Sequence, residues 1–122
     1  MVEHLAGIRI LLVEDHGDTL DLLQEVLRQL GATVTAVPTA REAVALVADA
    51  DIVVTDYKLP EEDGVWLLEQ VNLQARPVPV LLASGFAPEQ VPRLAEAAFA
   101  RKLLKPVDPW ELSGVIGDVL RR

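Results

Sequence analysis

The sequence predicts an α/β fold: a single doubly wound three-layer sandwich with a five-stranded parallel sheet between two layers of helices. Two observations support this prediction. Short, almost wholly apolar runs alternate with amphipathic segments, which is typical of a parallel sheet covered on both faces. The 122 residues suit one domain, and no linker or internal repeat divides them. We therefore expect one unit over residues 1–122.

The chain begins with an apolar run over 8–13, which we interpret as a buried strand. A helix is expected over 18–30, because leucines recur there every three or four residues and share one face. Asp18 has the side chain of an N-cap, and Gly31 is suited to end the helix. The residues of the apolar face are Leu20, Leu23, Leu27 and Leu30.

The second β-α unit starts with a strand expected over 33–37, where threonine and valine predominate. Thr39 and Glu42 have the spacing of a capping box, which predicts a helix to about residue 48. The apolar run over 51–55 is the third predicted strand.

A helix is predicted to start at Asp63-Gly64 and to run to about residue 75, with three apolar residues facing the core. The fourth strand is predicted over 78–83, with prolines only at its start, where they are tolerated. Pro92 would break a helix interior, so we expect it to begin a short fourth helix over 92–98. The inward residues of the third helix are Val65, Leu68 and Val71.

The last two elements are a strand over 102–104 and a C-terminal helix. Asp108 supplies an N-cap for this helix, Pro109 occupies the first helical position, and Glu111 lies in the first turn. The apolar positions expected to face the core are Leu112, Val115, Ile116, Val119 and Leu120.

Composition excludes several kinds of protein. With 11 basic and 19 acidic residues the net charge is 11 − 19 = −8, which disfavours direct binding to nucleic acid or an anionic membrane. The chain has no cysteine, so disulfides and thiolate metal sites are excluded. No apolar run reaches the roughly 20 residues that span a bilayer, and no signal-peptide pattern is present. We expect a cytoplasmic protein.

Polar side chains stand where the predicted strands end. Glu14 and Asp15 follow the first strand, Asp56 the third, Ser84 the fourth and Lys105 the fifth. The carboxyl ends of parallel strands meet at one edge of the sheet, where ligands bind in such folds. We therefore expect all five side chains to converge there.

Three converging carboxylates require a cation, because two unit charges 4 Å apart repel by about 4 kcal/mol at an effective dielectric of 20. Oxygen ligands without histidine or cysteine favour Mg²⁺ or Mn²⁺. Asp56 could then act as a nucleophile that forms an acyl phosphate, with Lys105 and Ser84 binding the phosphoryl oxygens. The two histidines, His4 and His16, stand alone in the sequence, and we expect surface or loop positions for both.

Over essentially its full length, the chain resembles a response-regulator receiver domain of two-component signalling. The resemblance implies a flavodoxin-like fold with strand order 2-1-3-4-5. The matching motifs are Val13-Glu14-Asp15, Asp56-Tyr57-Lys58-Leu59-Pro60 with Gly64, Ala83-Ser84-Gly85, and Lys105-Pro106.

The resemblance also implies a function. Asp56 would accept a phosphoryl group from a histidine kinase or a phosphotransfer protein, and Ser84 and Lys105 would contact that group. The domain would be a signalling switch rather than an enzyme that turns over a separate substrate. The implied ligands of Mg²⁺ are Asp15 and Asp56, Glu14 through a water molecule, and the main-chain carbonyl of Lys58.

One position departs from the family pattern. Lys102 stands where the family usually has an aromatic residue that moves on activation, so that aromatic switch cannot operate here. We expect phosphorylation to change the surface over 84–110, mainly through the segment 84–92 and the short fourth helix. Lys58 and Phe86 should flank the phosphate, and Phe86 should shield it from water.

Two other functions fit the sequence less well. A phosphohydrolase resembling the haloacid dehalogenases would carry an acid two residues after the nucleophile, where this chain has Lys58. A receiver-like interaction module would typically lack a key acid or the lysine, and this chain keeps them. Flavin or dinucleotide binding is disfavoured because no glycine-rich loop follows the first strand. A free-standing regulator and a domain of a larger kinase or regulator both remain open.

Overall fold

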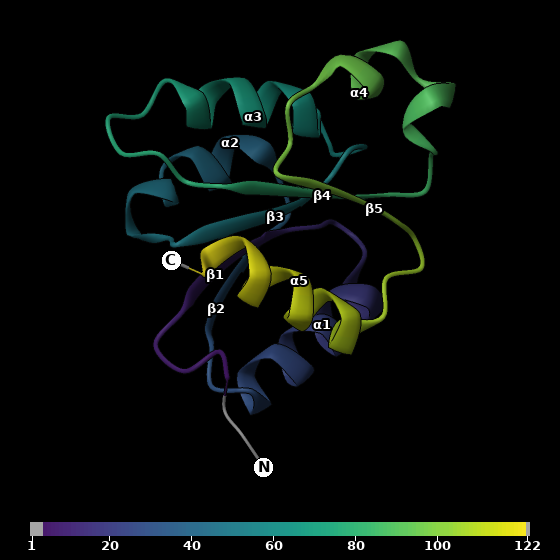
Figure 1. Cartoon of the computed structure of the whole chain (residues 1–122). Helices are drawn as coiled ribbons and strands as arrows, with labels where there is room; N and C mark the ends of the chain where they lie inside the picture. The colour runs from purple at the N-terminus through teal and green to yellow at the C-terminus, as the bar shows by residue number, and fades with distance from the viewer. Residues whose placement is uncertain (1–3, 122) are drawn as a thin grey trace.

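The computed structural model describes residues 4–121, and a five-stranded parallel sheet forms its centre (Figure 1). The strand order is β2-β1-β3-β4-β5, so both the predicted fold class and the implied order are confirmed. The chain steps from β1 first to β2 and then back to β3, which makes the β1–β3 edge the switch point of the sheet. The strands are β1 (Arg9–Val13), β2 (Thr33–Val37), β3 (Ile52–Asp56), β4 (Val80–Ser84) and β5 (Arg101–Leu104).

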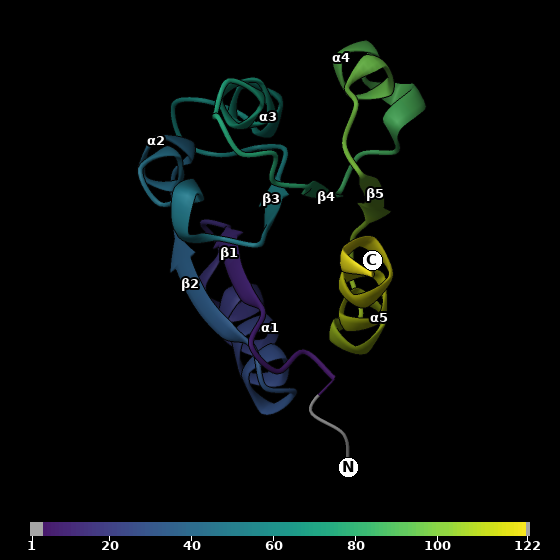
Figure 2. The same ribbon diagram turned by 60° about the vertical axis from the view of Figure 1, so that its left-hand side comes forward.

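Helices cover both faces of the sheet, as expected for parallel strands. Figure 2 shows α1 and α5 on one side and α2, α3 and α4 on the other. Among the described residues, no helix is long and apolar enough to cross a membrane. The helices are α1 (Gly17–Gln29), α2 (Ala40–Val44), α3 (Gly64–Asn72), α4 (Pro92–Glu96) and α5 (Pro109–Leu120), with 3₁₀ turns at Val47–Asp49 and Pro88–Gln90.

The core has two halves because successive strand residues point to opposite faces. In β1, Leu11 and Val13 pack with α2, α3 and α4, whereas Ile10 and Leu12 pack with α1 and α5. The strands β3 and β4 are buried along their whole length. This rigid centre fixes the backbone from which the polar strand ends project.

Two predicted helix caps, Thr39 and Asp108, are confirmed, and Asp63 is a third cap that the structure adds. The side chain of Thr39 accepts a hydrogen bond from the backbone N–H of Glu42. The Asp63 side chain accepts one from Trp66, and the Asp108 side chain accepts one from Trp110. Each cap satisfies a backbone donor that the first helical turn leaves unpaired.

The start of α1 differs from the prediction, because His16 and not Asp18 is the N-cap residue. The backbone of His16 is extended and Gly17 is already helical, so Asp18 lies in the first turn. An acid there still interacts favourably with the positive end of the helix dipole. Gly31 adopts a positive φ of 100° after the helix, as its predicted role as a stop requires.

Several element ends also differ. The helix expected to reach residue 48 stops at Val44, and the chain then tightens into a 3₁₀ turn in which Val47 is fully buried. α3 and α4 end three and two residues earlier than expected, and β4 begins at Val80 rather than residue 78. Pro79 has no N–H for the sheet, although its carbonyl still accepts a hydrogen bond from Val53.

Gly64 opens α3 directly against the end of β3. A Cβ at this position would collide with the carbonyl oxygen of Asp56 and lie 3.2 Å from the Cα of Tyr57. Both are backbone atoms, so neither can rotate away. We expect Gly64→Ala to lower the free energy of unfolding by about 1–3 kcal/mol, as overpacking does.

Urea denaturation of Gly64→Ala and the wild type measures this effect. Gly114→Ala is the matched control, because that position in α5 is exposed and has open space around it. The control should gain up to about 1 kcal/mol from helix propensity. Wild-type stability in Gly64→Ala would contradict the tight contact.

Candidate functional site

The sheet brings the predicted polar residues to its carboxyl edge. Asp56 and Ser84 are the last residues of β3 and β4, and Glu14 and Lys105 directly follow β1 and β5. Backbone hydrogen bonds extend the ladder past the strand ends: Glu14 N–H donates to Val37 O (3.1 Å), and Lys105 N–H donates to Ser84 O (2.7 Å). The backbone therefore places these side chains.

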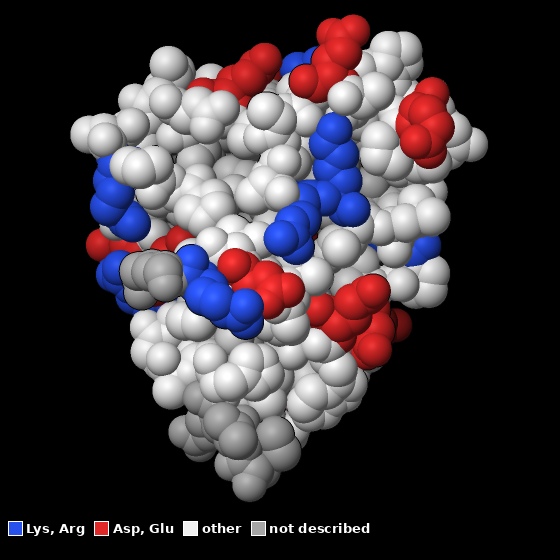
Figure 3. Space-filling model, viewed as in Figure 1, with Lys and Arg blue, Asp and Glu red and all other residues white. Residues whose placement is uncertain are grey.

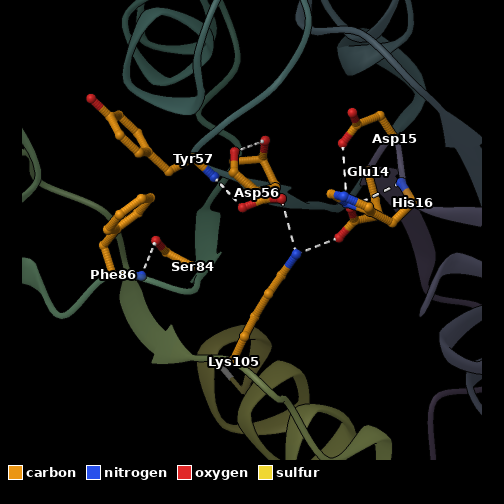
Figure 4. Close-up of polar contacts among 9 residues, drawn as sticks. Glu14, Asp15, His16, Asp56, Tyr57, Ser84, Phe86 and Lys105 are labelled. Carbon is orange, nitrogen blue, oxygen red and sulfur yellow. Dashed lines mark hydrogen bonds and ion pairs between the residues drawn. The ribbon is translucent and has the colours of Figure 1, made fainter.

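Lys105 lies between two acids from different strands (Figure 4). Its Nζ is 2.7 Å from Glu14 Oε1 and 2.9 Å from Asp56 Oδ2. Glu14 is 5% exposed and Asp56 7%, so both carboxylates are shielded from water. The ammonium offsets their mutual repulsion, and its removal would leave two buried acids uncompensated.

The second oxygen of each acid has a different partner. Asp56 Oδ1 accepts a hydrogen bond from Tyr57 N–H at 2.7 Å. Glu14 Oε2 accepts one from His16 N–H at 3.1 Å and lies 2.9 Å from Nδ1 of the same histidine. Each carboxylate therefore has one oxygen on Lys105 and the other on the loop that follows its strand.

Asp15 and His16 complete the cluster on its more exposed side. His16 Nδ1 lies 3.4 Å from Asp15 Oδ1. One potential ligand atom from each of Glu14, Asp15, His16 and Asp56 lies within 4.8 Å of the others. The predicted convergence of the three acids is present in the structure. His16 is exposed as expected, but it contacts the acids, which its lone occurrence in the sequence did not indicate.

The charged forms of these groups are mutually supported. Burial acts to raise the pKa of Glu14, but the hydrogen bonds from Lys105 and His16 outweigh it and lower that pKa. Burial acts to lower the pKa of Lys105, and the hydrogen bonds to Glu14 and Asp56 outweigh this and raise it. The hydrogen bond to Glu14, followed by the charge of Asp15, raises the pKa of His16.

Ser84 and Phe86 form the side of the site nearest β4. Ser84 is almost fully buried, and its Oγ accepts a hydrogen bond from Phe86 N–H at 3.0 Å. The hydroxyl keeps its own proton for donation. The Phe86 ring meets Tyr57 edge to face at 6.3 Å between centroids, and Lys58 Nζ lies 5.9 Å from the Phe86 centroid.

Two basic side chains connect the short helix α4 to the rest of the domain. Lys102 is half-buried, and its Nζ donates to the carbonyl oxygen of Ala95 in α4 at 3.3 Å. Arg93 of α4 forms an ion pair with Asp63, the N-cap residue of α3. Lys102 therefore connects β5 to α4.

Comparison with known proteins agrees with this site. The family model of the response regulator receiver domain matches residues 10–116. A 14.6 kDa protein of the sodA1 3′ region of Leptolyngbya boryana is 36% identical, and the alignment covers 91% of this chain and 88% of that protein. The two-component response regulator ARR11 of Arabidopsis thaliana is 31% identical over 95% of this chain, which spans only 23% of ARR11.

A solved structure is similar over nearly its whole length. The receiver domain of a sensor histidine kinase from Pseudomonas aeruginosa PAO1 is 28% identical, with a TM-score of 0.82, and the match covers 93% of this chain and 97% of that one. The fold, the acid cluster with its lysine and the family match lead to one conclusion. The chain belongs to the family of response regulator receiver domains, the signalling switches of two-component systems.

Proposed function

We propose that the chain is a phosphorylation switch in which Asp56 accepts a phosphoryl group from a phosphohistidine. An Asp56 oxygen forms the new bond to phosphorus while the bond from phosphorus to the histidine nitrogen breaks, and the histidine leaves. The donor would be a histidine kinase or a phosphotransfer protein. The observation that carries the proposal is the Asp56–Lys105 pair inside the acid cluster, which provides a nucleophile beside a fixed cation.

The donor set fits a divalent cation. Oxygens of Glu14, Asp15 and Asp56 lie close enough together to bind one ion, and their charge calls for one. The similar Pseudomonas domain holds magnesium in its active-site cleft, which supports Mg²⁺, with Mn²⁺ as the alternative. When bound, the ion would supply positive charge to the phosphoryl oxygens. We further propose that Glu14 contacts the ion through a water molecule and that the main-chain carbonyl of Lys58 is a ligand.

The other residues would hold and protect the phosphoryl group. The Lys105 ammonium would shift from the acids to a phosphoryl oxygen, and Ser84 would donate its hydroxyl proton to another. The Phe86 ring lies beside the site and packs edge to face against Tyr57. In this position it would limit access of water to the acyl phosphate.

A cavity next to Asp56 supports docking of a protein donor. It measures about 460 Å³ and opens between α1 and the segment after β5. Its walls are mainly apolar, so an apolar side chain of the donor could anchor there while the phosphohistidine reaches Asp56. The apolar lining includes Leu22, Leu23, Pro106 and Val107.

The readout would pass through α4. Tyr57 N–H bonds to Asp56, Gly64 N–H bonds to Tyr57 O (2.8 Å), and the adjacent Asp63 holds Arg93 of α4. A phosphoryl group on Asp56 alters the first of these contacts, and the change can reach α4 through the last. Figure 3 shows basic side chains across the middle of the face formed by α4, β5 and α5, with acidic ones above and below.

The two alternatives have less support. A phosphohydrolase needs a general acid two residues after the nucleophile, and Lys58 at that position cannot supply a carboxyl proton. An interaction module independent of phosphorylation would have no use for the buried Glu14–Lys105–Asp56 arrangement. These contacts favour the switch.

Phosphorylation by a small-molecule donor, compared between the wild type and variants of single acids, tests the proposal. We expect acetyl phosphate with Mg²⁺ to label the wild type, and Asp56→Ala to abolish labelling because the nucleophilic oxygen is gone. Asp118→Asn, an exposed acid of α5, is the control and should label normally. Labelling that survives Asp56→Ala would remove Asp56 from the mechanism.

After removal of acetyl phosphate, the label should decay faster in Phe86→Ala than in the wild type, because the ring would no longer limit access of water. An unchanged decay rate would contradict this role of Phe86.

Hydrogen exchange tests the readout. We expect a beryllofluoride phosphoryl mimic to change amide protection over 84–96 more than in α2, which serves as an internal reference. Arg93→Gln should shrink this change, because it removes the ion pair to Asp63. Arg9→Gln is the matched control, since it removes an ion pair to Asp51 at the opposite end of the strands from the site. Unchanged protection over 84–96 would refute the readout through α4.

A further inference from the structure

We propose that His16 is a direct ligand of the divalent cation at this site, and that it shifts the site's preference from Mg²⁺ toward first-row transition metals. The inference rests on the metal site of the proposed function and deepens it. The sequence alone indicated a site with oxygen ligands only. In the structure, however, the His16 ring lies against Glu14 and Asp15, and the inference is argued from this contact.

The distances fit one ion. His16 Nδ1 lies 2.9 Å from Glu14 Oε2 and 3.4 Å from Asp15 Oδ1, and the four potential ligand atoms including Asp56 span at most 4.8 Å. Metal–ligand bonds of about 2.1 Å place opposite ligands roughly 4.2 Å apart. A small closure of the exposed His16 and Asp15 side chains would bring the set to that span.

Lys105 leaves this side of the cluster open. Its ammonium contacts Glu14 Oε1 and Asp56 Oδ2, whereas His16 contacts Glu14 Oε2. A cation bound to Asp15, Asp56 and His16, with Glu14 Oε2 accepting a hydrogen bond from one of its waters, would therefore lie on the side of the cluster that the ammonium does not occupy. The Lys105 ammonium and a metal ion could therefore occupy the cluster together, each at its own position.

The loop holds the imidazole in position. The backbone N–H of His16 donates to the same Glu14 oxygen that the ring contacts, so the residue is tied to the acid at two points. Within the described residues, its side chain does not cap α1, although His16 occupies the N-cap position. The ring is 71% exposed, so an ion from solvent can reach Nδ1, and the imidazole releases its Nδ1 proton to water when the ion binds.

Ligand chemistry then sets the preference. Mg²⁺ favours oxygen ligands and its own water, and gains little from an imidazole. Affinity for nitrogen ligands rises from Mn²⁺ toward Co²⁺ and beyond along the first row. Binding of Mg²⁺ should therefore depend on the acids alone, whereas binding of Co²⁺ should depend on the acids and His16 together.

Calorimetric titration with Mg²⁺ and Co²⁺ tests this difference. We expect His16→Gln to weaken Co²⁺ binding about tenfold or more, the scale on which metal-site substitutions act, and to change Mg²⁺ binding less than about twofold. His16→Asn should behave in the same way. His4→Gln removes the other histidine of the chain, which lies outside the cluster, and should leave both affinities unchanged.

Proton NMR of the Co²⁺ form adds a structural signature. A metal-bound imidazole gives a strongly shifted, exchangeable N–H signal, which we expect in wild type and His4→Gln but not in His16→Gln. The same Co²⁺ to Mg²⁺ affinity ratio in wild type and His16→Gln, or no such signal in wild type, would overturn the role of His16. Wild type that binds neither ion would instead refute the proposed metal site itself.

Discussion

The Lys105 ammonium between Glu14 and Asp56 is the interaction on which the site depends. Two largely buried carboxylates at the ends of different strands would repel each other strongly, and the lysine offsets that repulsion. Each acid still keeps one oxygen away from the lysine. Asp56 uses it to hold the loop toward α3, and Glu14 uses it to hold His16. One ammonium therefore organises both loops.

The same contacts explain how a small domain could turn a chemical event into a change of surface. Asp56 is connected through Tyr57 to the start of α3, and through Asp63 and Arg93 to α4. The helix α4 has only five residues, so a few contacts determine its position. Lys102, which replaces the usual aromatic residue, holds α4 through the carbonyl of Ala95. Under the proposed readout, ion pairs and hydrogen bonds would take the place of an aromatic rotamer in linking the site to α4.

Much of the fold and of the candidate site could be predicted from the sequence. Parallel strands give uninterrupted apolar runs, and their carboxyl ends meet at one edge of the sheet. That reasoning placed Asp56, Ser84 and Lys105 correctly at the ends of strands. It failed where tertiary contacts decide. The end of the second helix at Val44 depends on how Val47 is buried, and the contact of His16 with Glu14 depends on a loop conformation that residue spacing does not encode. The only available signal for His16 was its position directly after the acid pair.

If the acids form a metal-binding site in the folded domain, Mg²⁺ must stabilise the fold, and this linkage tests the site most directly. The free energy of unfolding would be measured by urea denaturation at increasing Mg²⁺ for the wild type and for Asp15→Asn, which leaves the Lys105 contacts in place. At 100 times its dissociation constant, Mg²⁺ should stabilise the wild type by about 2.7 kcal/mol, and Asp15→Asn by much less at the same concentration. Wild-type stability that does not respond to millimolar Mg²⁺ would contradict a metal-binding site among the acids.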